Sequence, residues 1–129
     1  MKPKILIVLA DYYKEISVKM LDSTIDHVDK KSKFNLIRVP GVFEIPVVIS
    51  KNIKKYDGFI ALGCVIKGET PHFDFISQAT TNAIMQLSID YKKPIGNGII
   101  TALSKDQASN RSIKKGEEAA AAVFSVLSK

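Results

Sequence analysis

Continuous apolar runs alternate along the chain with stripes of apolar residues at helical spacing. The run KILIVLA at 4–10 is apolar after its first residue, which is typical of a parallel strand covered on both faces. Strands are predicted at 4–10, 34–39, 57–66 and 94–101. Helices are predicted at 11–28, 42–53 and 74–89, and a last one opens at Ser104 with the capping-box pattern SKDQ. A turn at 112–116 is expected before an alanine-rich helical stretch at 119–127.

This alternation predicts an α/β fold. Four strand–helix units favour a single domain, residues 1–129, built on a four-stranded parallel sheet with helices on both faces and right-handed connections. Ligands of such sheets bind beyond the carboxyl ends of the strands. The residues just past the four predicted strands are therefore the first place to look for chemistry.

Composition and charge argue against several classes of protein, among them nucleic-acid-binding and membrane-spanning proteins. The chain of 129 residues is 46% hydrophobic and has a net charge of +6, with the lysines spread along it rather than packed in one run. No nucleic-acid motif is found, so we expect no nucleic-acid partner, and the positive balance suits an anionic substrate. The apolar runs are too short to span a membrane, and no signal peptide or metal-ligand cluster is seen. With Cys64 as the single cysteine, a cytoplasmic protein without disulfides is expected.

One stretch, GCVIKGETPHFD at 63–74, joins the third strand to the third helix. Its glycines, Gly63 and Gly68, allow the backbone to bend and to approach a ligand. Thr70 is a good N-cap and Pro71 suits the first helical position, so the helix start favours an anion such as a phosphate. His72 follows at once and can transfer protons near neutral pH. The alternative is an ordinary strand, turn and capped helix with a solvated His72.

This stretch resembles the signature of 6,7-dimethyl-8-ribityllumazine synthase, an enzyme of riboflavin biosynthesis. Two further stretches match the same family in the same order: the aromatic Tyr12 after the first strand, and PGVFEIP at 40–46. The resemblance implies a flavodoxin-like three-layer sandwich and a transferase that needs no cofactor or metal. The implied substrates are 5-amino-6-ribitylaminopyrimidine-2,4-dione and 3,4-dihydroxy-2-butanone 4-phosphate, and the products are the lumazine, phosphate and water.

The resemblance also assigns roles to residues. His72 would transfer protons, Tyr12 would stack on the heterocycle, and Glu44 would accept hydrogen bonds from the ribityl hydroxyls. The pyrimidinedione would be bound by backbone groups of Val42, Phe43, Cys64, Val65 and Ile66. Asn97 would lie against the heterocycle, and the phosphate would be bound by Glu69, Thr70, Arg111 and Lys115. Cys64 as a nucleophile is the weaker alternative, because an apolar strand raises a thiol pKa.

The chain departs from the family pattern in two places. Asp11 and Tyr13 flank Tyr12 where relatives have Arg and Asn, so the contacts of those two residues cannot be carried over. The connection between Arg111 and Lys115 is also shorter than in relatives, which leaves the role of Lys115 open. Either basic residue could instead be an ordinary solvated charge on the last helix.

The predicted fold class also suits two functions other than catalysis. A receiver-type signalling module would need an aspartate where Cys64 ends the third strand. A flavin- or lumazine-binding protein of the same fold, without catalysis, is the remaining alternative.

The family implies a homo-oligomer, and the short segment before the first strand favours a pentamer over a decamer or a closed shell. The sites would then lie between subunits, with Asn97 and Arg111 supplied by the neighbour.

Overall fold

A parallel four-stranded sheet in the order β2-β1-β3-β4 forms the middle layer of the fold. The computed structural model describes residues 2–129. The strands are β1 (Lys4–Ala10), β2 (Lys33–Val39), β3 (Gly58–Ile66) and β4 (Ile95–Ala102). The helices are α1 (Lys14–Val28), the 3₁₀ turn η1 (Val42–Glu44), α2 (Ile45–Asn52), α3 (His72–Tyr91) and α4 (Lys105–Leu127). The predicted α/β class, the parallel sheet and the three layers are confirmed.

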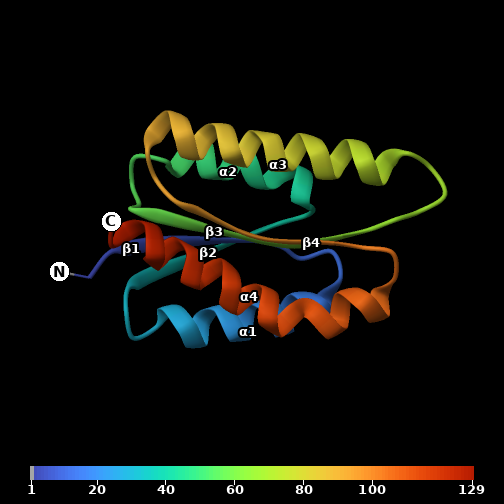
Figure 1. Cartoon of the computed structure of the whole chain (residues 1–129), viewed down its shortest axis with the longest axis horizontal. Coiled ribbons are helices and arrows are strands. Elements are labelled where there is room, and N and C mark those ends of the chain that lie inside the picture. The colour runs from blue at the N-terminus through green and yellow to red at the C-terminus, as the bar shows by residue number, and fades with distance from the viewer. Residues whose placement is uncertain (1) are drawn as a thin grey trace.

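Helices cover both faces of the sheet, α1 and α4 on one and α2 and α3 on the other (Figure 1). The central strand β1 serves both layers, because successive side chains of a strand point to opposite faces. Ile5, Ile7 and Leu9 pack in the core beneath α1 and α4. Leu6 and Val8 pack in the core beneath α2 and α3. This two-sided burial explains why the sequence of β1 is continuously apolar rather than alternating.

Two predicted helix starts lie too early in the sequence. The first helix begins at Lys14 rather than at residue 11, because Tyr13 is still extended with φ −99° and ψ 91°. The second begins as the 3₁₀ turn η1 and becomes α-helical only at Ile45, with Pro46 in its first turn. Both delays leave residues 11–13 and 41–44 as short connections at the carboxyl ends of β1 and β2, where they are free to line a site.

The expected turn at 112–116 is wrong, because α4 runs unbroken from Lys105 to Leu127. Gly116 lies where α4 crosses α1, and a Cβ there would come within 2.6 Å of the Met20 carbonyl oxygen. Glycine at this position therefore serves close helix packing rather than a turn. The capping prediction at the start of the helix is confirmed, since the Ser104 hydroxyl accepts a hydrogen bond from the Gln107 amide at 3.2 Å.

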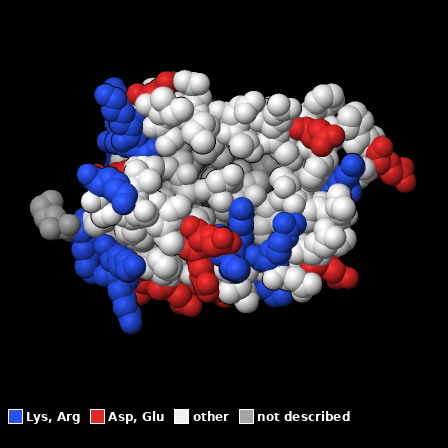
Figure 2. Space-filling model, viewed as in Figure 1, with Lys and Arg blue, Asp and Glu red and all other residues white. Residues whose placement is uncertain are grey.

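Lysines dispersed in the sequence gather at one end of the fold (Figure 2). They lie at the amino ends of strands and in the connections after helices: Lys4, Lys30, Lys31, Lys33, Lys54, Lys55, Lys92 and Lys93. Helices end there, and basic side chains interact favourably with the carboxyl end of a helix dipole. Much of the positive charge thus lies at the end of the sheet opposite the carboxyl ends of the strands.

None of the helices in residues 2–129 is both long enough and apolar enough to cross a bilayer.

Candidate active site

A cavity of about 490 Å³ opens at the carboxyl ends of β1 and β3. Segments far apart in the sequence meet in its walls: the connection after β1, the η1 turn after β2, the end of β3 and the first turn of α3. The lining residues are Ala10, Tyr12, Tyr13, Gly41, Val42, Phe43, Glu44, Cys64, Val65, Ile66, His72 and Ile76. The lining is mostly apolar and aromatic with few polar groups, which is the usual character of a small-molecule site.

The η1 turn is held against β3 by close packing at Gly63. A Cβ on Gly63 would come within 2.5 Å of a Val42 methyl and 3.1 Å of the Ala10 Cβ. Gly63 has no positive φ, so the expected bend does not occur there; the glycine instead leaves room for Val42. Phe43 and Glu44 follow Val42 directly, and the Glu44 amide donates to the Gly41 carbonyl at 3.2 Å. Close packing at Gly63 therefore fixes where these two side chains stand.

His72 is the first residue of α3, with Pro71 rather than Thr70 at the N-cap position. The predicted cap is thus one residue early, because Pro71 has φ −71° and ψ 5°, outside the helical region, whereas the predicted helix range, which began at 74, starts two residues late. The Thr70 hydroxyl still accepts a hydrogen bond from the His72 amide, at 3.4 Å. The His72 side chain is exposed and lines the cavity, where it can reach a bound ligand.

Two ionisable side chains in the cavity are held in their neutral forms. Burial raises the pKa of the Cys64 thiol from 9.0 to about 11, and the Arg111 guanidinium offsets part of this rise. The thiol is therefore protonated at neutral pH, which is unfavourable for a nucleophile. Burial also raises the pKa of Tyr13, and the nearby Cys64 and Tyr12 add to this effect. Tyr13 thus offers a neutral hydroxyl, while the Lys105 ammonium lies 5.6 Å from the centre of its ring.

The structure brings eight of the predicted site residues into one cavity and leaves five outside it. The eight are Tyr12, Val42, Phe43, Glu44, Cys64, Val65, Ile66 and His72. Glu69 and Thr70 are exposed in the connection between β3 and α3. Asn97 is exposed in the edge strand β4, and its Oδ1 accepts from the Ile99 amide at 3.1 Å.

The two remaining predicted residues are on α4. The Arg111 guanidinium donates to the Thr101 carbonyl at 2.9 Å, near the end of β4. Lys115 follows one turn later on the same helix and is half-buried. Neither residue lines the cavity. Within one subunit, the cavity therefore holds the groups predicted for the pyrimidine, but not the Arg and Lys predicted for the phosphate.

Sequence reasoning left some lining residues out of the predicted site. Ile76 lies four residues after His72 on α3, so helical spacing places both on one face and could have identified it. Tyr13 was noted only as a departure from a family pattern, although it lines the cavity beside Tyr12, with ring centroids 4.9 Å apart. Ala10 and Gly41 carry no chemical signal in the sequence, since a small residue at a strand end is common.

Comparison with known proteins gives the same family over the whole described chain. The family described as 6,7-dimethyl-8-ribityllumazine synthase matches residues 2–129. The 6,7-dimethyl-8-ribityllumazine synthase of Bartonella tribocorum is 40% identical over 114 residues, which cover 85% of this chain and 76% of that protein. The protein of the same name from Bartonella bacilliformis is 40% identical over 121 residues, covering 90% and 79%. The chain belongs to the lumazine synthase family.

Membership of the lumazine synthase family makes the chain a transferase of riboflavin biosynthesis. A matching synthase from Agrobacterium fabrum, 38% identical over 115 residues, carries the same name. Nothing in the comparisons favours a lumazine-binding protein without catalysis, and a receiver module would need an acid where Cys64 stands. Among residues 2–129, no three His, Cys, Asp or Glu side chains stand close enough together to hold a metal ion.

Proposed function

We propose that the cavity between Tyr12, Glu44 and His72 is where this lumazine synthase condenses 5-amino-6-ribitylaminopyrimidine-2,4-dione with 3,4-dihydroxy-2-butanone 4-phosphate. One observation carries the proposal: three separate family segments meet in a single space of about 490 Å³. That volume is within the range of ordinary small-molecule pockets. The products are 6,7-dimethyl-8-ribityllumazine, phosphate and water.

The apolar part of the cavity suits the pyrimidine. Tyr12 is 73% exposed at the rim, so its ring face is available to stack on a planar heterocycle. Backbone groups of Cys64, Val65 and Ile66 at the end of β3 would pair with the polar edge of the pyrimidinedione, beside those of Val42 and Phe43. The Glu44 carboxylate would accept hydrogen bonds from the ribityl hydroxyls, which are neutral donors.

His72 would transfer protons during the reaction. The amine of the pyrimidine attacks the ketone to form an imine, phosphate is eliminated, and the ring closes. Each of these steps moves a proton, and a positioned general acid–base typically contributes about 10²–10⁴-fold. His72 lines the cavity from the first turn of α3, and the reacting amine would lie between it and the end of β3, which lines the same cavity.

The phosphate would bind at the start of α3. Backbone amides at Glu69 and Thr70 and the positive end of the helix dipole favour an anion there. The Glu69 carboxylate would point away, because its charge opposes that of a phosphate. Arg111 would supply a bidentate contact to the phosphate, with Lys115 beside it. Neither lines the cavity of its own subunit, so we assign both to the neighbouring subunit's site.

An uncharged face on the α2 and α3 layer supports an oligomer. No charged residue occurs from Phe75 to Ile89, and the middle of this layer is white in Figure 2. Large apolar side chains are exposed along it, including Phe75, Met85 and Ile89, each at least 59% accessible. Uncharged surface that exposes several large apolar side chains is typical of an interface. We propose a cyclic pentamer in which Asn97 on the edge strand and Arg111 complete the adjacent cavity.

One assay tests the function. The purified protein is mixed with both substrates, and the absorbance and fluorescence of the lumazine are followed against a sample without protein. We expect enzyme-dependent lumazine formation with release of one phosphate per lumazine. Lumazine binding without any increase in the rate of its formation would contradict the proposed catalysis.

A further inference from the structure

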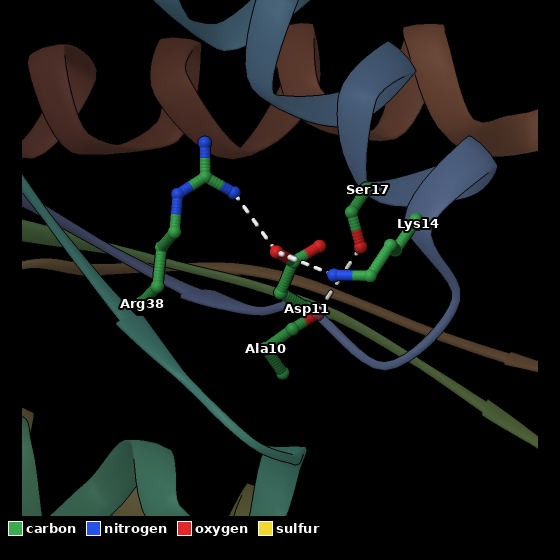
Figure 3. Close-up of polar contacts among 5 residues, drawn as sticks. All are labelled: Ala10, Asp11, Lys14, Ser17 and Arg38. Atoms are coloured by element: carbon green, nitrogen blue, oxygen red, sulfur yellow. Dashed lines mark hydrogen bonds and ion pairs between the residues drawn. The ribbon is translucent and has the colours of Figure 1, made fainter.

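Asp11 takes part in both ion pairs found among residues 2–129. Its Oδ2 atom lies 3.0 Å from Nη1 of Arg38 and 3.7 Å from Nζ of Lys14. Figure 3 shows the carboxylate between these two cations. The Asp11 side chain is 21% exposed, against 53% for Arg38 and 81% for Lys14, so Arg38 is both the closer and the better shielded partner.

These contacts fasten the connection between β1 and α1. Arg38 belongs to the edge strand β2, and Lys14 is the first residue of α1. The Asp11 amide also donates to the Val39 carbonyl at 3.0 Å, and the Ser17 hydroxyl donates to the Ala10 carbonyl at 3.3 Å (Figure 3). The start of α1 has no side-chain cap of its own. Asp11 therefore joins β1, β2 and α1 at the point where the chain enters the cavity wall.

Tyr12, the next residue, depends on this anchoring. Its side chain is 73% exposed, and its ring meets that of Tyr13 edge to face with centroids 4.9 Å apart. So exposed a ring cannot be fixed by core packing. Its position over the cavity is set mainly by the backbone of residues 11–13.

We propose that Asp11 and Arg38 form a positioning pair that holds Tyr12 over the heterocycle. The pair thereby sets the affinity for the pyrimidine substrate and the lumazine product. This inference rests on the proposed role of Tyr12 in the active site. A partly exposed ion pair contributes little to global stability, so its main effect is on the ligand and not on folding. The pair also uses the aspartate by which this chain departs from the family pattern.

The experiment compares Arg38→Met and Asp11→Asn with the native enzyme. Dissociation of 6,7-dimethyl-8-ribityllumazine is measured by fluorescence titration, and KM is measured for each substrate. We expect Kd for the lumazine and KM for the pyrimidine to rise by about three- to tenfold, the size of a lost aromatic stacking contact. KM for the butanone phosphate and the melting temperature should stay close to native.

Two controls separate positioning from general damage. Lys33→Met removes a cation from the opposite end of β2 and should leave all three constants unchanged. Arg111→Ala removes the only other arginine and should affect the butanone phosphate instead. In a Tyr12→Ala background, Arg38→Met should have no further effect on lumazine binding, because the pair acts through the ring.

Three results would overturn the inference: unchanged lumazine binding in Arg38→Met, equal losses for both substrates, or a full additional loss in the Tyr12→Ala background. The titration does not depend on turnover. An enzyme that binds lumazine but does not form it would contradict the proposed function, while the response of Kd to Arg38→Met would still decide the positioning role.

Discussion

A methyl group of Val42 fills the space that a side chain on Gly63 would need, with a Cβ at Gly63 falling 2.5 Å from Val42 Cγ1. The contact joins the η1 turn to the end of β3, the two segments that face the cavity beside His72. Because Phe43 and Glu44 follow Val42, the packing at Gly63 sets the geometry of two predicted substrate contacts at once.

Gly63→Ala should therefore impair both stability and binding. Overpacking a closed site costs about 1–3 kcal/mol, and the η1 turn is the element that can yield. We expect a lower free energy of unfolding in urea and a raised KM for the pyrimidine. Gly68→Ala is the matched control, since a Cβ there meets nothing within 4 Å and should change neither quantity. Native stability and native KM in Gly63→Ala would show that Val42 moves freely.

The chain has two histidines, and only one of them lines the cavity. We expect His72→Ala to lower kcat by about tenfold or more through loss of proton transfer, while the melting temperature stays near native because the side chain is exposed. His27 stacks on Phe124 in the α1 and α4 layer, so His27→Gln serves as the control and should keep native kcat. Native turnover of His72→Ala would remove His72 from the mechanism.

Arg111 should discriminate between the two substrates. Removing a charge-assisted bidentate contact costs about 1.5–3 kcal/mol, and the phosphate is the only group that the guanidinium is proposed to bind. KM for the butanone phosphate should rise much more in Arg111→Ala than KM for the pyrimidine, as measured by steady-state kinetics at fixed saturating co-substrate. Equal rises would indicate that the hydrogen bond from Arg111 to the Thr101 carbonyl is structural.

The thiol of Cys64 gives a prediction on pH dependence. Because burial raises its pKa to about 11, the thiol stays protonated through neutral pH and ionises only as the pH rises toward that value. Alkylation by iodoacetamide should be slow at pH 7.5 and should continue to accelerate above pH 9, where an ordinary thiol levels off. Lumazine should slow the reaction by covering the end of β3. Rapid alkylation at neutral pH would mean that Cys64 is an activated thiol.

The sequence predicted the sheet well because β1 and β3 are apolar on both faces, a pattern typical of strands buried inside a parallel sheet. It misjudged 112–116 because the turn was inferred from a connection shorter than in the family, whereas Gly116 lies in α4 and is buried against α1 in the folded chain. Helix starts were placed too early at residues 11 and 42, since polar and aromatic residues in short connections resemble a first helical turn.

The candidate site was predictable where chemistry lies in one segment, as at 63–74. The parts of the site that depend on contacts between distant segments could not be predicted from the sequence. The Asp11 and Arg38 side chains are 27 residues apart and meet only because β1 and β2 are paired in register. Arg111 and Asn97 lie outside the cavity of their own chain, and we propose that they belong to a site shared with a neighbouring subunit.

We propose that each site is completed by a neighbouring subunit, and complementation tests this shared site most directly. His72→Ala and Arg111→Ala are co-expressed with different tags, and mixed oligomers carrying both tags are purified and assayed at low butanone phosphate. If His72 and Arg111 come from adjacent subunits, about one quarter of the interfaces in an equal random mixture regain both residues, so activity should recover toward a quarter of native. Activity no higher than the average of the two separate variants would place both residues in the same subunit and contradict the shared site.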